Sequence, residues 1–249
     1  MNYLNKLLEL IASFLAVTIV LTFHEFAHAF AAYRSGDPTP KWNGRLSLNP
    51  LRHFDPIGLV CFTLVGFGWA KPVPINPDNF KHYRRGLAFT ASAGVIMNYL
   101  MAFLSFPLFL VVLNYVHVPV LSEFLYNFTY FLFAYSLSFC VFNLLPFYPL
   151  DGFRIVEACS KKHGKVYQFL RKYGYYILLF LIVESFICRI FTDYLGAEII
   201  GQTGAMVMNY MNILGWIMKF ATNIFGYPIS ALWGLIPWPI GVSWRIIPW

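Results

Sequence analysis

The segment Leu7–Tyr33, LLELIASFLAVTIVLTFHEFAHAFAAY, decides the fold class of this chain. It is longer than the roughly 20 apolar residues that a helix needs to cross a bilayer. Its ionisable side chains are Glu9 and a group near its end, His24, Glu25 and His28. We therefore expect a transmembrane helix that carries three ionisable side chains into the membrane.

The composition points the same way. Of the 249 residues, 59% are hydrophobic and only 12% are charged, whereas a soluble domain has about 25% charged residues. These values exclude a soluble enzyme and a disordered chain and favour an integral membrane protein in a lipid bilayer. The four cysteines are scattered, with no CxxC pair, so they predict neither a disulfide framework nor a thiolate metal site.

Other apolar segments complete the expected helical polytopic membrane protein. Three have the length and character of spans: Leu87–Leu113, Phe124–Leu150 and Tyr173–Phe191. The tail from Tyr194 is apolar but interrupted by Gly and Pro, and it holds five of the seven tryptophans. It suits interfacial or re-entrant segments, or one more span near Ala205–Phe225. We expect about four to six transmembrane helices, with a membrane-embedded core at 1–191 and an apolar Trp/Pro-rich segment of open role at 192–249.

Loop charges predict the orientation. Eight basic residues lie within residues 34–85 and six within 152–172, whereas the segment 114–123 has none. Four alternating spans put the two basic segments on one side, which the positive-inside rule makes cytoplasmic. In a membrane protein the net charge of +7 reflects this bias, so we expect no nucleic-acid partner. We expect a multi-pass protein of the cell membrane.

The end of the first span carries the motif His24-Glu25-Phe26-Ala27-His28, an HExxH pattern. Histidines four residues apart project from one face of a helix and can hold one metal ion, while the adjacent glutamate can reach a metal-bound water. Ionisable side chains inside a membrane helix are costly, so a functional role is the first interpretation. The motif predicts metal binding by His24 and His28 and base catalysis by Glu25.

A catalytic zinc site usually needs a third protein ligand, and Asp151 is the best placed candidate. At about 1.5 Å per residue, His28 lies roughly 9 Å and His24 roughly 15 Å from Arg34 along the first span. Asp151 ends a long apolar segment just before the basic residues of the second cytoplasmic loop, at a similar depth. Other acids are worse placed: Glu9, Glu123 and Glu184 fall toward the opposite face, and Asp55 and Asp78 lie in polar loops.

Together these residues resemble the site-2 protease family of intramembrane zinc metalloproteases. Four ordered motifs carry the resemblance: HEFAH (His24–His28), two loop segments (Gly44–Gly58 and Phe67–Pro77), ASAGVIMN (Ala91–Asn98) and NLLPFYPLDG (Asn143–Gly152). Some members of that family insert a PDZ domain after the second core helix, and others append a CBS domain. Only a ten-residue loop follows the second span here, so the chain resembles a minimal bacterial-type form.

The resemblance implies roles residue by residue. His24, His28 and Asp151 would be zinc ligands, Glu25 the general base, and Asn98 and Asn143 polar groups near the scissile carbonyl. The implied substrate is a single-pass transmembrane protein or a signal-peptide remnant, cut near the cytoplasmic face in regulated intramembrane proteolysis. The implied enzyme is a zinc metalloendopeptidase, and the oligomeric state stays open.

Other chemistries remain possible from the residues alone. Two histidines and a carboxylate also suit Fe(II), but a water-activating Glu25 and the absence of any redox partner favour zinc. A membrane metallohydrolase acting on lipid would use the same groups. A zinc or proton transporter would need polar residues continuing to the outer face, and the first span offers only Ser13 and Thr18 between Glu9 and Thr22.

A peptide substrate must be extended at the scissile bond, and its backbone then needs hydrogen-bond partners in an apolar setting. Arg45–Leu48 alternates as a strand would, and Trp69–Ile75 contains prolines that suit an edge strand. The apolar Ile57–Gly68 between them could return the chain through the membrane surface. We therefore expect a small re-entrant β-sheet between the first two spans, to which the substrate adds a strand.

Overall fold

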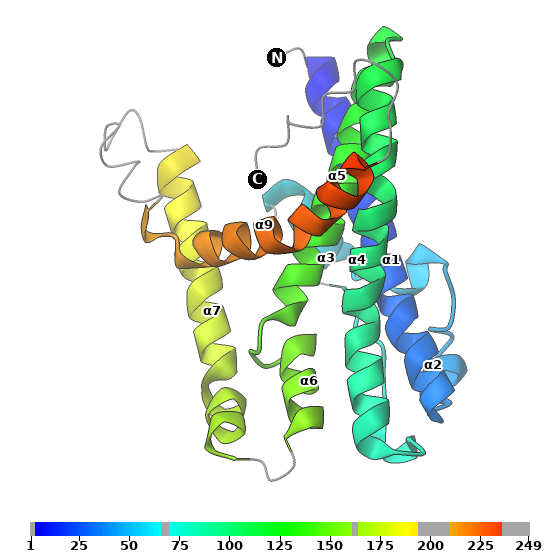
Figure 1. Cartoon of the computed structure of the whole chain (residues 1–249), viewed down its shortest axis with the longest axis vertical. Coiled ribbons are helices and arrows are strands. Elements are labelled where there is room, and N and C mark those ends of the chain that lie inside the picture. Colours follow the sequence, from blue (N-terminus) through cyan, green and yellow to red (C-terminus); the bar gives the residue numbers. More distant parts are fainter. Residues whose placement is uncertain (1–2, 66–69, 161–163, 194–209, 236–249) are drawn as a thin grey trace.

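The computed structural model describes residues 3–65, 70–160, 164–193 and 210–235. Four helices are long and apolar enough to cross a membrane: α1 (Tyr3–Ser35), α4 (Tyr83–Tyr115), α5 (Pro119–Leu144) and α7 (Lys165–Asp193). They run roughly along the long axis of the molecule (Figure 1). The expected helical polytopic membrane protein is confirmed. The described residues contain four candidate spans, the lower limit of the four to six that we expected.

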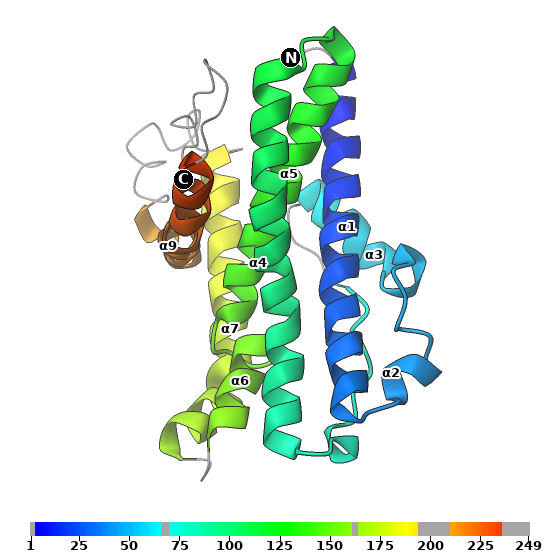
Figure 2. The ribbon, with the colours of Figure 1, turned by 45° about the vertical axis from the view of Figure 1, so that its right-hand side comes forward.

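Helices α1, α4 and α5 form the bundle that carries the site, with α1 and α4 antiparallel (Figures 1 and 2). Small residues of α1, including Ala12, Ala16 and Ala27, are almost fully buried. In lipid, helices associate through close packing rather than through burial from water, so small residues let the backbones approach. The α4–α5 contact is instead filled by large side chains such as Phe106 and Phe133.

The expected third span ends earlier than its apolar run. Helix α5 stops at Leu144, and after a short connection a new helix, α6 (Asp151–Cys159), begins. Pro146 and Pro149 lie in this connection, where prolines cannot continue a helix. A side chain at Gly152 would collide with the carbonyl oxygens of Leu144 and Leu145. The close approach fixes the start of α6 against the end of α5.

The segment between α1 and α4 folds over one side of α1. It contains two short helices, α2 (Thr39–Trp42) and α3 (Pro56–Val65), and single 3₁₀ turns at Pro50–Arg52 and Pro77–Asn79. Asp37 anchors both ends of the segment, because its fully buried carboxylate accepts hydrogen bonds from Thr39, from the backbone of Asn76 and from the side chain of Asn79. Figure 2 shows α2 and α3 outside α1.

The small re-entrant sheet is not supported, because the described residues contain no strand. They contain a single isolated antiparallel bridge between Phe54 and Ala70. The side chain of Arg45, instead of a neighbouring strand, donates to the carbonyls of Lys71 and Pro72. The backbone groups that a sheet would have paired are therefore already used. Part of the expected return segment, residues 66–69, lies outside the described residues.

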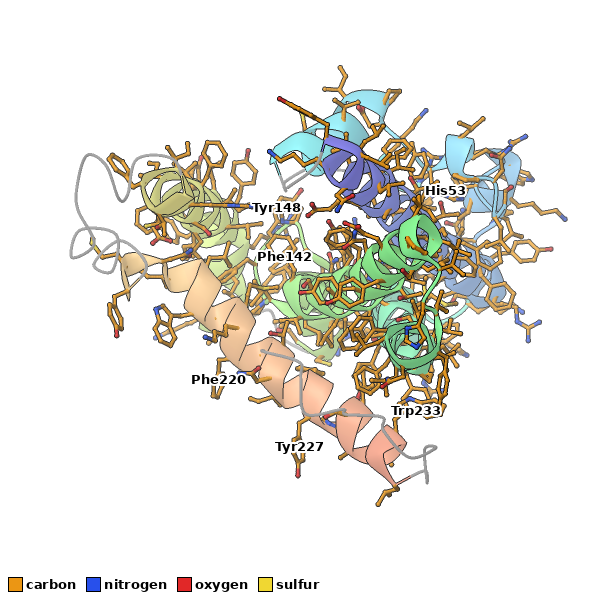
Figure 3. The ribbon with its side chains drawn as sticks, turned by 90° about the horizontal axis from the view of Figure 1, so that it is seen from above. His53, Phe142, Tyr148, Phe220, Tyr227 and Trp233 are labelled. Carbon is orange, nitrogen blue, oxygen red and sulfur yellow. The ribbon has the colours of Figure 1, made fainter. Side chains whose placement is uncertain are left out.

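The described part of the tail forms α9 (Ile213–Gly234), which is not one of the four apolar spans. It runs across the bundle from α7 to α4 (Figures 1 and 3). Its first backbone N–H, at Ile213, donates to Glu184 of α7 at 3.1 Å, and Nε1 of Trp233 donates to the carbonyl of Phe103 of α4 at 2.9 Å. Ile229 is fully buried between them, in the core of α4 and α5. The expected further span near Ala205–Phe225 overlaps α9 only in part, and residues 205–209 lie outside the described residues.

Candidate metal centre

His24 and His28 lie on the face of α1 that packs against α4, and both are buried. Their Nε2 atoms face each other at 3.0 Å. Nδ1 of His28 lies 2.8 Å from the carbonyl oxygen of Thr90. Since a carbonyl can only accept, the proton of His28 belongs on Nδ1, which leaves the lone pair of Nε2 free. Two imidazole nitrogens that face each other at this distance can share a proton or bind one metal ion.

Asp151 supplies the third group. As the first residue of α6, it is brought beside α1 by the tight packing of Gly152 on the end of α5. Its Oδ2 lies 3.4 Å from Nε2 of His24 and 3.0 Å from Nε2 of His28. Burial alone would raise the pKa of Asp151, but the adjacent imidazoles of His28 and His24 hold the pKa of this carboxyl well below its ordinary value. The carboxylate is therefore ionised, as a metal ligand must be.

The geometry of the three groups fits a tetrahedral zinc ion. All three ligand atoms lie within 4.8 Å of one another, and the three pairwise distances given above are 3.0, 3.0 and 3.4 Å. Ligands about 2.1 Å from a tetrahedral zinc ion stand roughly 3.4 Å apart. The three groups therefore need only a small expansion to hold the ion. The structure brings together the three residues that the sequence named as ligands.

One face of α4 forms the support behind these ligands. Thr90, Gly94 and Asn98 follow one another at four-residue intervals, so they lie in a row on the helix. Thr90 contacts His28, and the side-chain amide of Asn98 lies 3.0 Å from Nδ1 of His24. Gly94 lies between them, and a β-carbon there would overlap both imidazole rings. Outer partners of this kind fix the orientation of metal-binding histidines.

Asn98 contacts His24 and does not line the cavity. Its side chain is fully buried and is not part of the wall of the cavity described below, so it lies behind His24. Its Oδ1 is buried with no hydrogen-bond partner. A 180° turn of the amide, which exchanges its oxygen and nitrogen, would let Oδ1 accept a proton from Nδ1 of His24. That arrangement leaves Nε2 of His24 free for the metal.

Glu25 lies on the side of α1 that faces the segment after Ala70. Its Oε2 accepts a hydrogen bond from the backbone N–H of Val73 at 3.2 Å. Pro72 and Pro74 on either side have no N–H, so Val73 provides an isolated donor at this point. The contact holds one carboxylate oxygen of Glu25, and the other oxygen is left to accept a proton.

A cavity of about 180 Å³ contains the site. Its wall includes both histidines, Glu25 and Asp151, together with residues from every surrounding segment: Pro72, Val73, Ile75, Leu87, Thr90, Ala91, Asn143, Pro149, Leu150 and Arg154. Asn143 thus lines the same cavity as the three ligands, and one of its two N–H groups donates to the carbonyl of Phe139 at 3.0 Å. The arrangement can bind a divalent metal and place a base beside it.

Four residues of the site were not named from the sequence: Thr90, Gly94, Val73 and Arg154. Thr90 acts through its backbone carbonyl, and Val73 acts through its backbone N–H. Because backbone groups of this kind occur in nearly every residue type, the sequence does not reveal these contacts. Gly94 did have a signal, because it stands four residues before Asn98 within the small-residue motif. Arg154 follows Asp151 by three residues, which is the spacing of one helical face.

Comparisons with known proteins agree with this description. The sequence profile described as Peptidase family M50 matches residues 115–184, which include Asp151. The candidate zinc metalloprotease YwhC of Bacillus subtilis (strain 168) is 38% identical over 178 residues, which are 68% of this chain and 80% of that protein. The candidate zinc metalloprotease Rip2 of Mycolicibacterium smegmatis is 26% identical over 199 residues, 78% of this chain and 73% of that protein. No solved structure matches the chain significantly.

Proposed function

Because the chain belongs to peptidase family M50, the site-2 protease family, we propose that it is an intramembrane zinc metalloendopeptidase. Its substrate would be a single-pass transmembrane protein or a signal-peptide remnant, cut near the cytoplasmic face. One observation carries the proposal: the ligand atoms of His24, His28 and Asp151 converge beside Glu25 in one cavity. The names of the two relatives also support zinc.

The protein groups divide the work of hydrolysis. When bound, zinc would lower the pKa of a water ligand and polarise the substrate carbonyl. Glu25 would take the proton of the attacking water on its free oxygen and later give it to the leaving amine. The Val73 N–H would hold the other oxygen in place during both transfers. The second N–H of Asn143 would donate to the negative charge that develops on the carbonyl oxygen.

Asn98 would act one step behind the reaction. We propose that its Oδ1 accepts from Nδ1–H of His24, in place of the substrate contact that the resemblance implied. Thr90 would do the same for His28 through its carbonyl. With the Nδ1 atoms protonated, both Nε2 atoms would be held as metal ligands.

The orientation belongs to the proposal as well. The basic segments 34–85 and 152–172 favour a cytoplasmic location for the end of the molecule that contains α2 and α6. In Figure 1 this is the lower end, where α1 and α6 meet the loops. The cavity would then open near the cytoplasmic face, from which water and the released product could exchange.

The described residues give a transporter little support. On α1 above the site, Ser13 is paired with Tyr135 at 2.7 Å, and Thr22 donates to the carbonyl of Thr18. The hydroxyls of Ser13 and Thr22 are thus satisfied locally, and the buried hydroxyl of Thr18 has no partner among the described residues. They do not form a polar path from the metal centre to the far end of the bundle.

A cleavage assay tests the proposal. The purified protein in lipid nanodiscs would be given zinc and a fluorescent transmembrane peptide, and products would be identified by mass spectrometry. We expect cleavage that stops when a chelator removes zinc, returns when zinc is restored, and is absent with Glu25→Gln. Hydrolysis of the nanodisc phospholipids with the peptide intact would overturn the proposal in favour of a lipid hydrolase.

A further inference from the structure

Arg154 places a positive charge on the wall of the metal cavity. Arg154 lines the same cavity as His24, His28 and Asp151, and the residue is exposed. Arg154 lies in the first turn of α6, three residues after Asp151, so the two side chains project from one face of the helix. Asp151 points to the metal ligands, and Arg154 stands one turn further from them along α6.

The neighbouring acids are already engaged. Asp151 faces the two histidines, Glu25 holds the Val73 N–H, and Glu157 on α6 accepts from the hydroxyl of Tyr167 at 3.1 Å. Over the residues that the structure describes, Arg154 takes part in no ion pair. By contrast, Arg171 on the facing helix α7 donates to Tyr167 at 3.0 Å. Within the described part of the chain, Arg171 thus has a side-chain partner and Arg154 has no ionic one.

The helix terminus itself does not favour a cation at this position. The N-terminal turn of a helix carries partial positive charge, which favours acids there and disfavours a basic residue. A guanidinium keeps its charge at every physiological pH and offers a planar pair of donors that matches a carboxylate. A free guanidinium in a place that does not favour it, on the wall of a catalytic cavity, indicates a ligand with negative charge.

We propose that Arg154 is a specificity-determining residue that binds an acidic side chain of the substrate, in the flank on the cytoplasmic side of the scissile bond. This inference rests on the proposed function. The direction follows from α6, which runs from Asp151 to the end where Arg84 at the start of α4 donates to the carbonyl of Ser160. A transmembrane segment has few charges within its apolar part, so an acid reaching Arg154 would come from the flank.

A peptide is favoured over a lipid phosphate as the source of the charge. The wall that holds Arg154 also holds Glu25 and Asn143, which act on the scissile bond in the proposed mechanism. The substrate peptide must therefore occupy this cavity. An acidic residue a few positions from its scissile bond can then reach Arg154, and no lipid molecule is needed in the cavity.

The test uses matched peptides. Each would have about 20 apolar residues and would carry Glu, Gln or Lys at successive positions of its cytoplasmic flank. For the wild-type protein we expect kcat/KM to be about three- to tenfold higher with Glu than with Gln at the best position, expressed mainly in KM. Arg154→Gln should abolish this preference while retaining zinc. Arg154→Glu should reverse it in favour of Lys.

Lys165→Gln is the matched control, since Lys165 is an exposed cation at the start of α7 and is not part of the cavity wall. It should keep the preference for Glu. A preference that survives Arg154→Gln, or that Lys165→Gln removes equally, would overturn the proposal. A third outcome would also overturn it. If Arg154→Gln lowers kcat/KM equally for all peptides, by an amount that depends on the phosphatidylglycerol content of the nanodisc, then Arg154 binds lipid phosphate.

A binding measurement separates failure of this inference from failure of the proposed function. The same peptides, with a fluorescent label, would be titrated into zinc-loaded Glu25→Gln and into Glu25→Gln with Arg154→Gln. Tighter binding of the Glu peptide to the first protein only supports the role of Arg154 even where no peptide is cleaved. Equal binding of Glu and Gln peptides to the first protein rejects that role, whatever the outcome of the cleavage assay.

Discussion

Thr90 and Asn98 lie two helical turns apart on α4, and each contacts the Nδ1 atom of one of the two site histidines. His24 and His28 lie only one turn apart on the antiparallel α1, so Thr90 and Asn98 contact the two rings from either side of Gly94, and one face of α4 orients both rings. The support of the metal centre is therefore set by the register between two helices.

Removal of the Asn98 side chain should weaken metal binding. Asn98→Ala leaves Nδ1 of His24 without a partner in a fully buried position, and loss of such an outer contact typically costs 10- to 100-fold in metal affinity. Zinc affinity would be measured by competition with a chromogenic chelator. Asn143→Ala is the control and should retain zinc while losing turnover. Unchanged affinity in Asn98→Ala would refute the assignment.

Gly94 should tolerate no side chain. The β-carbon of Gly94→Ala would overlap both imidazoles, so the rings must turn away from the point where the ligand atoms meet. We expect loss of most bound zinc, measured by elemental analysis of the purified protein. Gly164→Ala makes the same chemical change where a β-carbon would meet no described atom within 4 Å beyond its chain neighbours, and this variant should keep its zinc. Full zinc content in both variants would show that α1 and α4 do not pack as described.

Glu25→Gln should separate metal binding from turnover. The amide can still accept from the Val73 N–H, so the local structure is kept. It cannot take a proton from water, and general-base catalysis is typically worth 10²- to 10⁴-fold. We expect a loss of kcat in that range with unchanged zinc stoichiometry. Turnover near the wild-type level would remove Glu25 from the proposed mechanism.

Asp37 makes the loop segment sensitive to acid. Burial would raise the pKa of Asp37, but hydrogen bonds from Asn79, Thr39 and the backbone of Asn76 lower it below its ordinary value. A lowered pKa contributes stability above the unfolded value of about 3.9, and this stability is lost as the pH falls through the folded value. Asp37→Asn should therefore lower Tm at pH 7.

The cost of that substitution should be about 1–3 kcal/mol at pH 7, because it disturbs buried hydrogen bonds. Below pH 4 the wild-type carboxyl becomes protonated, and the two Tm values should converge. Thermal unfolding of both proteins in detergent over this pH range gives the measurement. A constant difference down to the lowest pH would contradict the lowered pKa.

A native cysteine can report the orientation. Cys159 is exposed at the end of α6, Cys61 on α3 is half-buried, and Cys140 and Cys188 are buried. With Cys61 replaced by serine, a membrane-impermeant maleimide should label Cys159 from the cytoplasmic side only. With both Cys61 and Cys159 replaced by serine, His117→Cys in the opposite loop should react from the outside only. The reverse pattern would invert the topology and with it the proposed cytoplasmic opening of the site.

Residues close in sequence were predicted best. The HExxH spacing fixes His24, Glu25 and His28 on one helix, and apolar length alone located the four spans. Helix α7 begins at Lys165, eight residues before the predicted start, because its first two turns are polar and hydropathy does not detect them. The end of α5 was placed too late for the opposite reason, since apolar residues continue to Leu150 after the helix has stopped.

Features that depend on long-range contacts were predicted less well. The alternation of Arg45–Leu48 favoured a strand, but the Arg45 side chain takes the carbonyls of Lys71 and Pro72 that a strand would need. The contact between Asn98 and His24 joins residues 74 positions apart. It depends on the register of two helices, which no local pattern encodes.

The crossing helix α9 contributes to the assembly of the helices and is not needed for their insertion into the membrane. The four apolar spans can enter the bilayer on their own hydropathy, whereas α9 is not among them. Its attachment depends on the fit of Ile229 among packed side chains and on hydrogen bonds at Glu184 and Trp233. In lipid these are packing and polar contacts, with no gain from leaving water. A chain cut before Ile213 should therefore still reach the membrane with its spans in place, but α7 would be tethered to the catalytic bundle mainly through α6.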